Sequence, residues 1–165
     1  MVNSMYYINY FFIMSIVGHV IESIFYSSGD SGILLGYWTT IYGIGTIIIL
    51  LVNKCVNRLK IKRFFKIITL FICCMVVLST IEVLGGYLIK WIFDKELWNY
   101  SNHRFNIGRY TSLEMSLLWG LSSLFFICFI KPIVDKFINK IPKIISYLLI
   151  TLFIIDIIAT IFIKT

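Results

Sequence analysis

Five long apolar runs, separated by shorter polar segments, set the pattern of this chain. An α-helix rises about 1.5 Å per residue, so about 20 apolar residues are needed to cross the hydrocarbon core of a bilayer. The runs that reach about this length cover residues 6–26, 34–52, 65–91, 111–130 and 144–163. The pattern therefore predicts an all-α fold, a polytopic membrane helical bundle of about five transmembrane helices, with residues 1–165 forming a single membrane domain.

The composition agrees with a membrane protein and excludes an ordinary water-soluble domain. Of the 165 residues, 59% are hydrophobic and 14% are charged, and the mean hydropathy is +0.92. The net charge of +7 does not indicate a nucleic-acid partner, because the basic residues lie in short segments between the apolar runs. The cysteines lack metal-type CxxC spacing and are expected to stay free thiols; they are Cys55, Cys73, Cys74 and Cys128.

The basic residues predict the orientation of the spans. Six lie at or between the second and third runs with no acid among them, and four lie between the fourth and fifth runs, opposed by Asp135. The other side carries four, so the positive-inside rule places the N-terminus in the cytoplasm and the C-terminus outside. No Lys or Arg precedes Lys54, so the first run is expected to be a retained span and not a signal peptide. Binding of anionic lipid headgroups is an additional interpretation of the six-residue cluster.

Four acidic residues fall inside the apolar runs. They are Glu22, Glu82, Glu114 and Asp156. A charged carboxylate at the bilayer centre costs roughly 2.5 to 3.5 kcal/mol on insertion scales, so a partner or a cavity is expected to compensate each one. The predicted orientation puts all four in the outer half of the bilayer, where they form a candidate polar layer in which Glu22 and Glu82 face each other. Such a layer suits a cation, a proton relay or a cationic substrate, and the alternative is that these acids make interhelical hydrogen bonds as neutral groups.

His19 precedes Glu22 by three residues, which places both side chains on one helical face. The pair admits a metal site or a proton relay. One histidine and scattered carboxylates do not make a metal-ligand spacing, so we favour a hydrogen bond from His19 to a neighbouring acid and predict no metal and no cofactor. In the fifth run, Thr160 lies one turn after Asp156 and is a candidate partner for that carboxylate.

Small and turn-forming residues predict where helices pack closely, bend or end. The candidate close-packing or kink positions are Gly18, Gly43, Gly45, Gly85 and Gly86. Residues 27–32 predict an outer loop, and residues 94–101 predict a segment along the outer interface. Pro132 and Pro142 are expected to end the helices on either side of the last inner loop.

An ordered series of short motifs resembles a known family. The series consists of Gly18-x-x-x-Glu22, Gly32, Ile41-Tyr42-Gly43-x-Gly45, Glu82, Leu97-Trp98-Asn99-Tyr100-Ser101, Asn106-x-Gly108 and Ser116-Leu117-Leu118-Trp119-Gly120. Over residues 7–121 it is similar to the ABC-transporter type IV membrane family, also called CmpB-like. The chain departs from the family pattern at His19, where members carry Trp, at residues 30–32 and at Tyr37. The resemblance implies a multi-pass protein of the bacterial inner membrane that acts as a transporter permease.

The resemblance leaves the substrate open. The chain carries no GxxxxGK[ST] phosphate-binding motif, so an ATPase is expected to be a separate subunit. Five short spans make a thin wall around a substrate path, which favours a homo-oligomer in the lipid bilayer. Two alternatives remain: a non-transporting accessory or scaffold membrane protein, and, with less support, an intramembrane enzyme acting on lipid or cell-wall precursors. We predict no enzymatic activity, because no recognised catalytic motif occurs.

Overall fold

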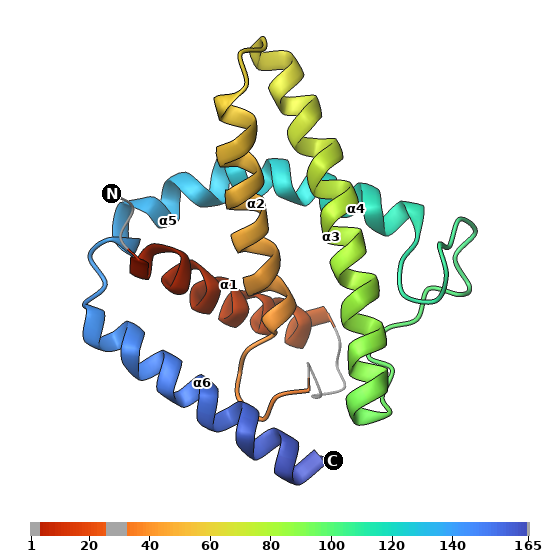
Figure 1. Cartoon of the computed structure of the whole chain (residues 1–165), viewed down its shortest axis with the longest axis vertical. Helices are drawn as coiled ribbons and strands as arrows, with labels where there is room; N and C mark the ends of the chain where they lie inside the picture. The colour runs from red at the N-terminus through yellow and green to blue at the C-terminus, as the bar shows by residue number, and fades with distance from the viewer. Residues whose placement is uncertain (1–3, 26–32, 165) are drawn as a thin grey trace. The chain divides into compact units, whose positions relative to one another are not determined.

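The computed structural model describes residues 4–25 and 33–164, and it is helical along most of this length. The helices are α1 (Ser4–Phe25), α2 (Thr40–Arg58), α3 (Arg63–Phe93), α4 (Leu113–Phe125), α5 (Lys131–Ile138) and α6 (Lys143–Lys164), with the π-helical turn η1 (Phe126–Ile130) joining α4 to α5 (Figure 1). Five stretches are long and apolar enough to span a membrane: α1, α2, α3, α6 and the continuous stretch Leu113–Ile138. The all-α membrane fold with about five transmembrane helices is therefore confirmed. The predicted loop at 27–32 lies outside the described residues.

The second helix begins at Thr40 and not at residue 34 as predicted. Residues 33–39 are bent and non-helical although most of them are apolar. The backbone amides of Leu35 and Gly36 donate to Thr160 Oγ1 at 3.2 Å and to the Asp156 carboxylate at 3.1 Å, so this segment is held by α6. Side chains of α6 thus fix the bent segment that precedes α2.

Pro132 does not end the fourth span, contrary to the sequence prediction. A proline in a regular helix lacks an N–H donor, and its ring clashes with the carbonyl four residues before it. Here the preceding turn is π-helical, and the Lys131 amide donates to the Phe126 carbonyl five residues back. The wider turn accommodates the ring, so α5 continues to Ile138. Pro142 stands directly before α6, at the end of the connection.

The chain divides into two compact units, one of residues 1–47 and 134–165 and one of residues 48–133. In the first unit α1 packs against α6. The hydroxyls of Tyr6 and Tyr10 on α1 both donate to Asp135 Oδ1 of α5 at 2.8 Å, and Ser146 of α6 donates to Asn9 at 2.7 Å. The sequence had identified Asp135 only as an acid beside basic residues. It holds the start of α1 through two hydroxyl groups.

In the second unit α3 packs along α4, with Ser79 donating to Ser116 at 2.7 Å between them. Gly120 of α4 lies against the Phe71 ring of α3, where an added Cβ would overlap the ring atoms. Large apolar side chains remain exposed on the long helices of both units; examples are Trp91 and Phe162, which are 82% and 84% exposed. Apolar surface of this kind is expected where helices meet lipid.

Candidate functional site

Glu82 of α3 is 3% exposed and is enclosed by neutral hydrogen-bond donors. Thr111 Oγ1 donates to Glu82 Oε2 at 2.9 Å, and the Tyr100 hydroxyl donates to Glu82 Oε1 at 3.3 Å. The Trp119 side chain of α4 also interacts with this carboxylate. Both carboxylate oxygens therefore have partners, and these come from the connection between α3 and α4 and from α4 itself.

The start of α4 places Thr111 beside Glu82. Ser112 is the N-cap of α4, and its Oγ accepts a hydrogen bond from the Met115 amide at 3.2 Å. Tyr110, the residue before Thr111, lies with its ring directly against Gly86 of α3, where an added Cβ would overlap the ring. Gly86 lies one turn after Glu82, so the close approach at the glycine brings the threonine hydroxyl to the carboxylate.

Glu22 of α1, in the first unit, has a similar environment. Thr39 Oγ1 donates to Glu22 Oε2 at 3.3 Å, and the Tyr42 side chain is a further hydrogen-bond partner. The Tyr42 ring lies against Gly18, where an added Cβ would overlap it. Glu22 is half-buried, whereas Glu82 is buried.

A similar set of side chains thus joins α1 to α2 and α3 to α4, although the glycine precedes the glutamate in α1 and follows it in α3. In each, a glutamate and a glycine stand four residues apart on the first helix, a tyrosine ring packs on the glycine, and a threonine just before the second helix donates to the glutamate. We call these the Glu22 cluster (Gly18, Glu22, Thr39 and Tyr42) and the Glu82 cluster (Glu82, Gly86, Tyr110 and Thr111). The sequence identified the glutamates and the glycines but gave no sign of the threonines.

Asp156 of α6 holds the non-helical segment before α2. Its carboxylate accepts hydrogen bonds from the Gly36 amide at 3.1 Å and from Trp38 Nε1 at 2.6 Å. Thr160 accepts from the Leu35 amide instead of bonding Asp156 as the sequence suggested. The partners of Asp156 are thus a backbone amide and an indole, which explains how a carboxylate is accommodated on an otherwise apolar helix.

Glu114 and His19 have more open surroundings. Glu114 lies in the first turn of α4, its side chain is 45% exposed, and His103 Nδ1 lies 4.0 Å from its Oε2. His19 is half-buried, its ring lies 5.3 Å from that of Tyr37, and it acts electrostatically on Glu22. Among residues 4–25 and 33–164, no three His, Cys, Asp or Glu side chains come together in a way that could hold a metal ion.

The two units divide the predicted site residues between them. His19, Glu22 and Asp156 belong to the first unit, and Glu82 and Glu114 belong to the second. Each acid has local partners of its own, as described above. The facing of Glu22 and Glu82 and the single polar layer stay predictions.

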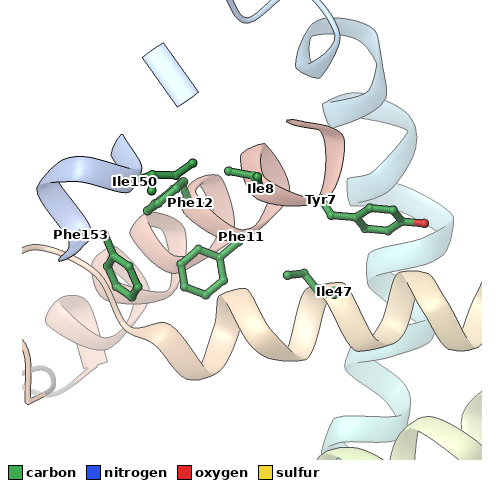
Figure 2. A pocket seen from close by; sticks show the side chains of 7 residues that line it. All are labelled: Tyr7, Ile8, Phe11, Phe12, Ile47, Ile150 and Phe153. Atoms are coloured by element: carbon green, nitrogen blue, oxygen red, sulfur yellow. The ribbon is translucent and has the colours of Figure 1, made fainter. Parts of the chain in front are cut away.

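An apolar groove of about 250 Å³ lies in the first unit between α1, α2 and α6 (Figure 2). Its lining consists of Tyr7, Ile8, Phe11, Phe12, Ile47, Ile150 and Phe153. Figure 2 shows the rings of Phe11 and Phe153 side by side, with their centroids 5.3 Å apart. None of the lining side chains is charged, and none belongs to the Glu22 cluster or the Glu82 cluster.

Two ion pairs lie at the connection between α3 and α4. Lys90 Nζ lies 2.8 Å from Asp94, and its hydrogen bond holds the pKa of the Asp94 carboxyl below its usual value. Arg109 lies 2.6 Å from Glu96, and this hydrogen bond raises the pKa of the guanidinium. All these side chains are at the surface, so the pairs are expected to contribute little to stability.

The searches of curated proteins and of solved structures found no match. The sequence model of a membrane-protein family, described as Putative ABC-transporter type IV, matches residues 9–161. This range extends beyond residues 7–121, where the motifs were found, and it includes Asp156. Because the match covers most of the chain and agrees with the motif resemblance, the chain belongs to the Putative ABC-transporter type IV family.

Proposed function

We propose that this multi-pass membrane protein is the permease-like component of a transporter, and that Glu22 and Glu82 bind a cationic substrate or a coupling ion. The observation that carries the proposal is the recurrence of a glutamate that accepts a hydrogen bond from a threonine hydroxyl, in two pairs of helices that are long and apolar enough to span a membrane. Ionisable side chains within such helices commonly mark substrate or ion pathways. Membership of a transporter family supports the same assignment.

The hydrogen-bond partners of Glu22 and Glu82 described above provide no positive charge to balance an ionised carboxylate. Hydroxyl groups of threonine and tyrosine orient a carboxylate, but they carry no positive charge to neutralise it. We therefore propose that Glu22 and Glu82 are compensated by a proton or by an incoming cation. The half-buried Glu22, beside His19, is the more accessible of the two, and we assign it to first contact with the cation.

The remaining features of the proposed transporter follow from the sequence. Hydrolysis of ATP requires a phosphate-binding loop, which this chain lacks, so we propose a separate ATPase subunit. We further propose a homo-oligomer in the bacterial inner membrane, with the N-terminus in the cytoplasm and both clusters in the outer half of the bilayer.

Transport assays in proteoliposomes test this function. The chain, purified with any ATPase that accompanies it from native membrane, is reconstituted with an entrapped pH-sensitive dye, and ethidium serves as a cationic probe. Glu22→Gln and Glu82→Gln are each expected to lower ATP-driven flux by roughly tenfold or more, because a hydrogen-bonded charge contributes about 1.5 to 3 kcal/mol. Asp94→Asn is the control, since that side chain is 92% exposed. Unchanged flux in both glutamate variants would refute the assignment.

A scaffold protein is the second candidate, and Asp156 is the observation that favours it. This acid is occupied in fixing the backbone near Gly36, which supports a structural use of carboxylates on these apolar helices. If Glu22 and Glu82 are also structural, their glutamine variants will weaken association with partner proteins. In that case the wild-type protein shows no transport activity in the flux assay. Co-purification from native membrane and the flux assay together separate the two functions.

A further inference from the structure

The connection between α2 and α3 exposes basic and apolar side chains together. All residues from 57 to 65 are exposed. The sequence contains no acidic residue between positions 31 and 81, so these cations have no acid near them along the chain. The connection between α3 and α4 differs, because its two acids Asp94 and Glu96 are paired with Lys90 at the end of α3 and with Arg109.

The turn between α2 and α3 is short and is stabilised by hydrogen bonds. α2 ends at Arg58 and α3 begins at Arg63, which leaves residues 59–62 to connect them. The Leu59 amide donates to the Val56 carbonyl at 3.1 Å, and Lys66 Nζ donates to the Asn57 carbonyl at 2.8 Å. Lys66 thus caps the end of α2. The cations at 58, 60, 62 and 63 are not used in this way.

Apolar side chains alternate with these cations. Leu59 is 45% exposed and Ile61 is 40% exposed, and they stand on either side of Lys60 in the sequence. Phe64 and Phe65, in the first turn of α3, are 68% and 54% exposed. A surface that mixes exposed cations with exposed apolar groups suits the boundary between headgroups and acyl chains.

We propose that this basic tip, residues 58–65, binds anionic phospholipid headgroups. Arg58, Lys60, Lys62 and Arg63 contact the phosphates, while the interleaved apolar side chains enter the acyl boundary. The length of the connection favours lipid over a distant protein partner, because four residues extend at most about 14 Å and both flanking helices are long and apolar enough to span a membrane. Each cation near an anionic membrane surface strengthens binding by about fivefold. The proposal is independent of the transport function.

Lipid binding by the full-length chain in detergent micelles provides the test. Phosphatidylglycerol and phosphatidylcholine are titrated separately, and bound lipids are counted by native mass spectrometry. Wild type is expected to bind phosphatidylglycerol more tightly, and added salt is expected to weaken this binding by screening. The double variant K60Q/K62Q is expected to lose roughly tenfold or more of its phosphatidylglycerol affinity without a change for phosphatidylcholine.

Two control variants make the result specific. K90Q/R109Q removes the same number of charges from cations that are already paired, so it should keep its affinity. K60R/K62R keeps both charges and should bind like wild type, which also covers the case in which the glutamine variant does not fold. Equal affinity for the two lipids, salt-independent binding, or equal losses in the test and control variants would overturn the proposal. So would full lipid affinity in K60Q/K62Q combined with loss of a co-purifying protein, because the tip would then be a protein-docking surface.

Discussion

Replacing Gly86 with alanine tests whether close helix approach holds the Glu82 cluster together. An added Cβ at Gly86 would overlap Cγ, Cδ1 and Cβ of Tyr110. These atoms lie at the root of a side chain that is 2% exposed, so rotation of the ring cannot remove the overlap. The backbone at Tyr110 must therefore shift, and this shift moves the adjacent Thr111 away from Glu82.

Gly85→Ala is a matched control in the neighbouring position. Its added Cβ would come no closer than 3.9 Å to Trp98, which is an ordinary contact. Both substitutions add one methyl group to the same helix, and both gain up to about 1 kcal/mol of helix propensity. Subtracting the two effects therefore leaves the cost of overlap at Gly86, which is expected to be about 1 to 3 kcal/mol, or roughly 5- to 150-fold in the unfolding equilibrium.

Unfolding in mixed micelles measures this difference. The two variants and wild type are titrated with sodium dodecyl sulfate, and the loss of helical circular dichroism gives the free energy of unfolding. Gly85→Ala is expected to be as stable as wild type or more stable, and Gly86→Ala is expected to fall below it by the stated amount. Equal stabilities, or a larger loss at Gly85, would show that Tyr110 does not pack on α3 as described.

Two further predictions concern α6 and the orientation. Asp156→Ala removes the acceptor for Gly36 and Trp38, so amide exchange in residues 33–39 should accelerate and stability should fall by about 1.5 to 3 kcal/mol. Asp94→Asn is the control, because asparagine tolerates the positive φ of that position, and it should leave the exchange of residues 33–39 unchanged. In a variant whose native cysteines are replaced by serine, a cysteine at Lys60 should react with an impermeant maleimide only after the cells are permeabilised. Labelling from outside would reverse the predicted orientation.

The number and order of the membrane-spanning helices could be predicted from the sequence, because a long apolar run has few other uses. The ends of the helices were harder to predict. Residues 34–39 are mostly apolar, yet contacts with Asp156 and Thr160, more than a hundred positions away in the chain, keep them out of α2. Continuation of the span past Pro132 depends on a π-helical turn for which the sequence gave no signal.

Only part of the candidate site could be predicted, because contacts between residues distant in the chain are not visible in the sequence. A carboxylate in an apolar run is visible in the sequence, so Glu22 and Glu82 could be identified. Thr39 and Thr111 are ordinary residues at helix starts, and only the folded hairpins bring them to the glutamates. Gly85 and Gly86 look equivalent in sequence, but the fold packs a ring against Gly86 and leaves Gly85 in ordinary contact.

The recurrence of the carboxylate cluster gives a physical criterion for separating structure from transport. Between membrane helices apolar burial provides no driving force, so close packing at a glycine and a hydrogen bond to a neighbouring side chain are what hold a hairpin together. A glutamine at Glu22 or Glu82 keeps one acceptor oxygen for the threonine and removes the charge. Loss of flux with unchanged unfolding would therefore assign the charge to cation or proton binding. Loss of stability that matches the loss of flux would instead assign the glutamate to the packing of the two helices, and each cluster is tested separately.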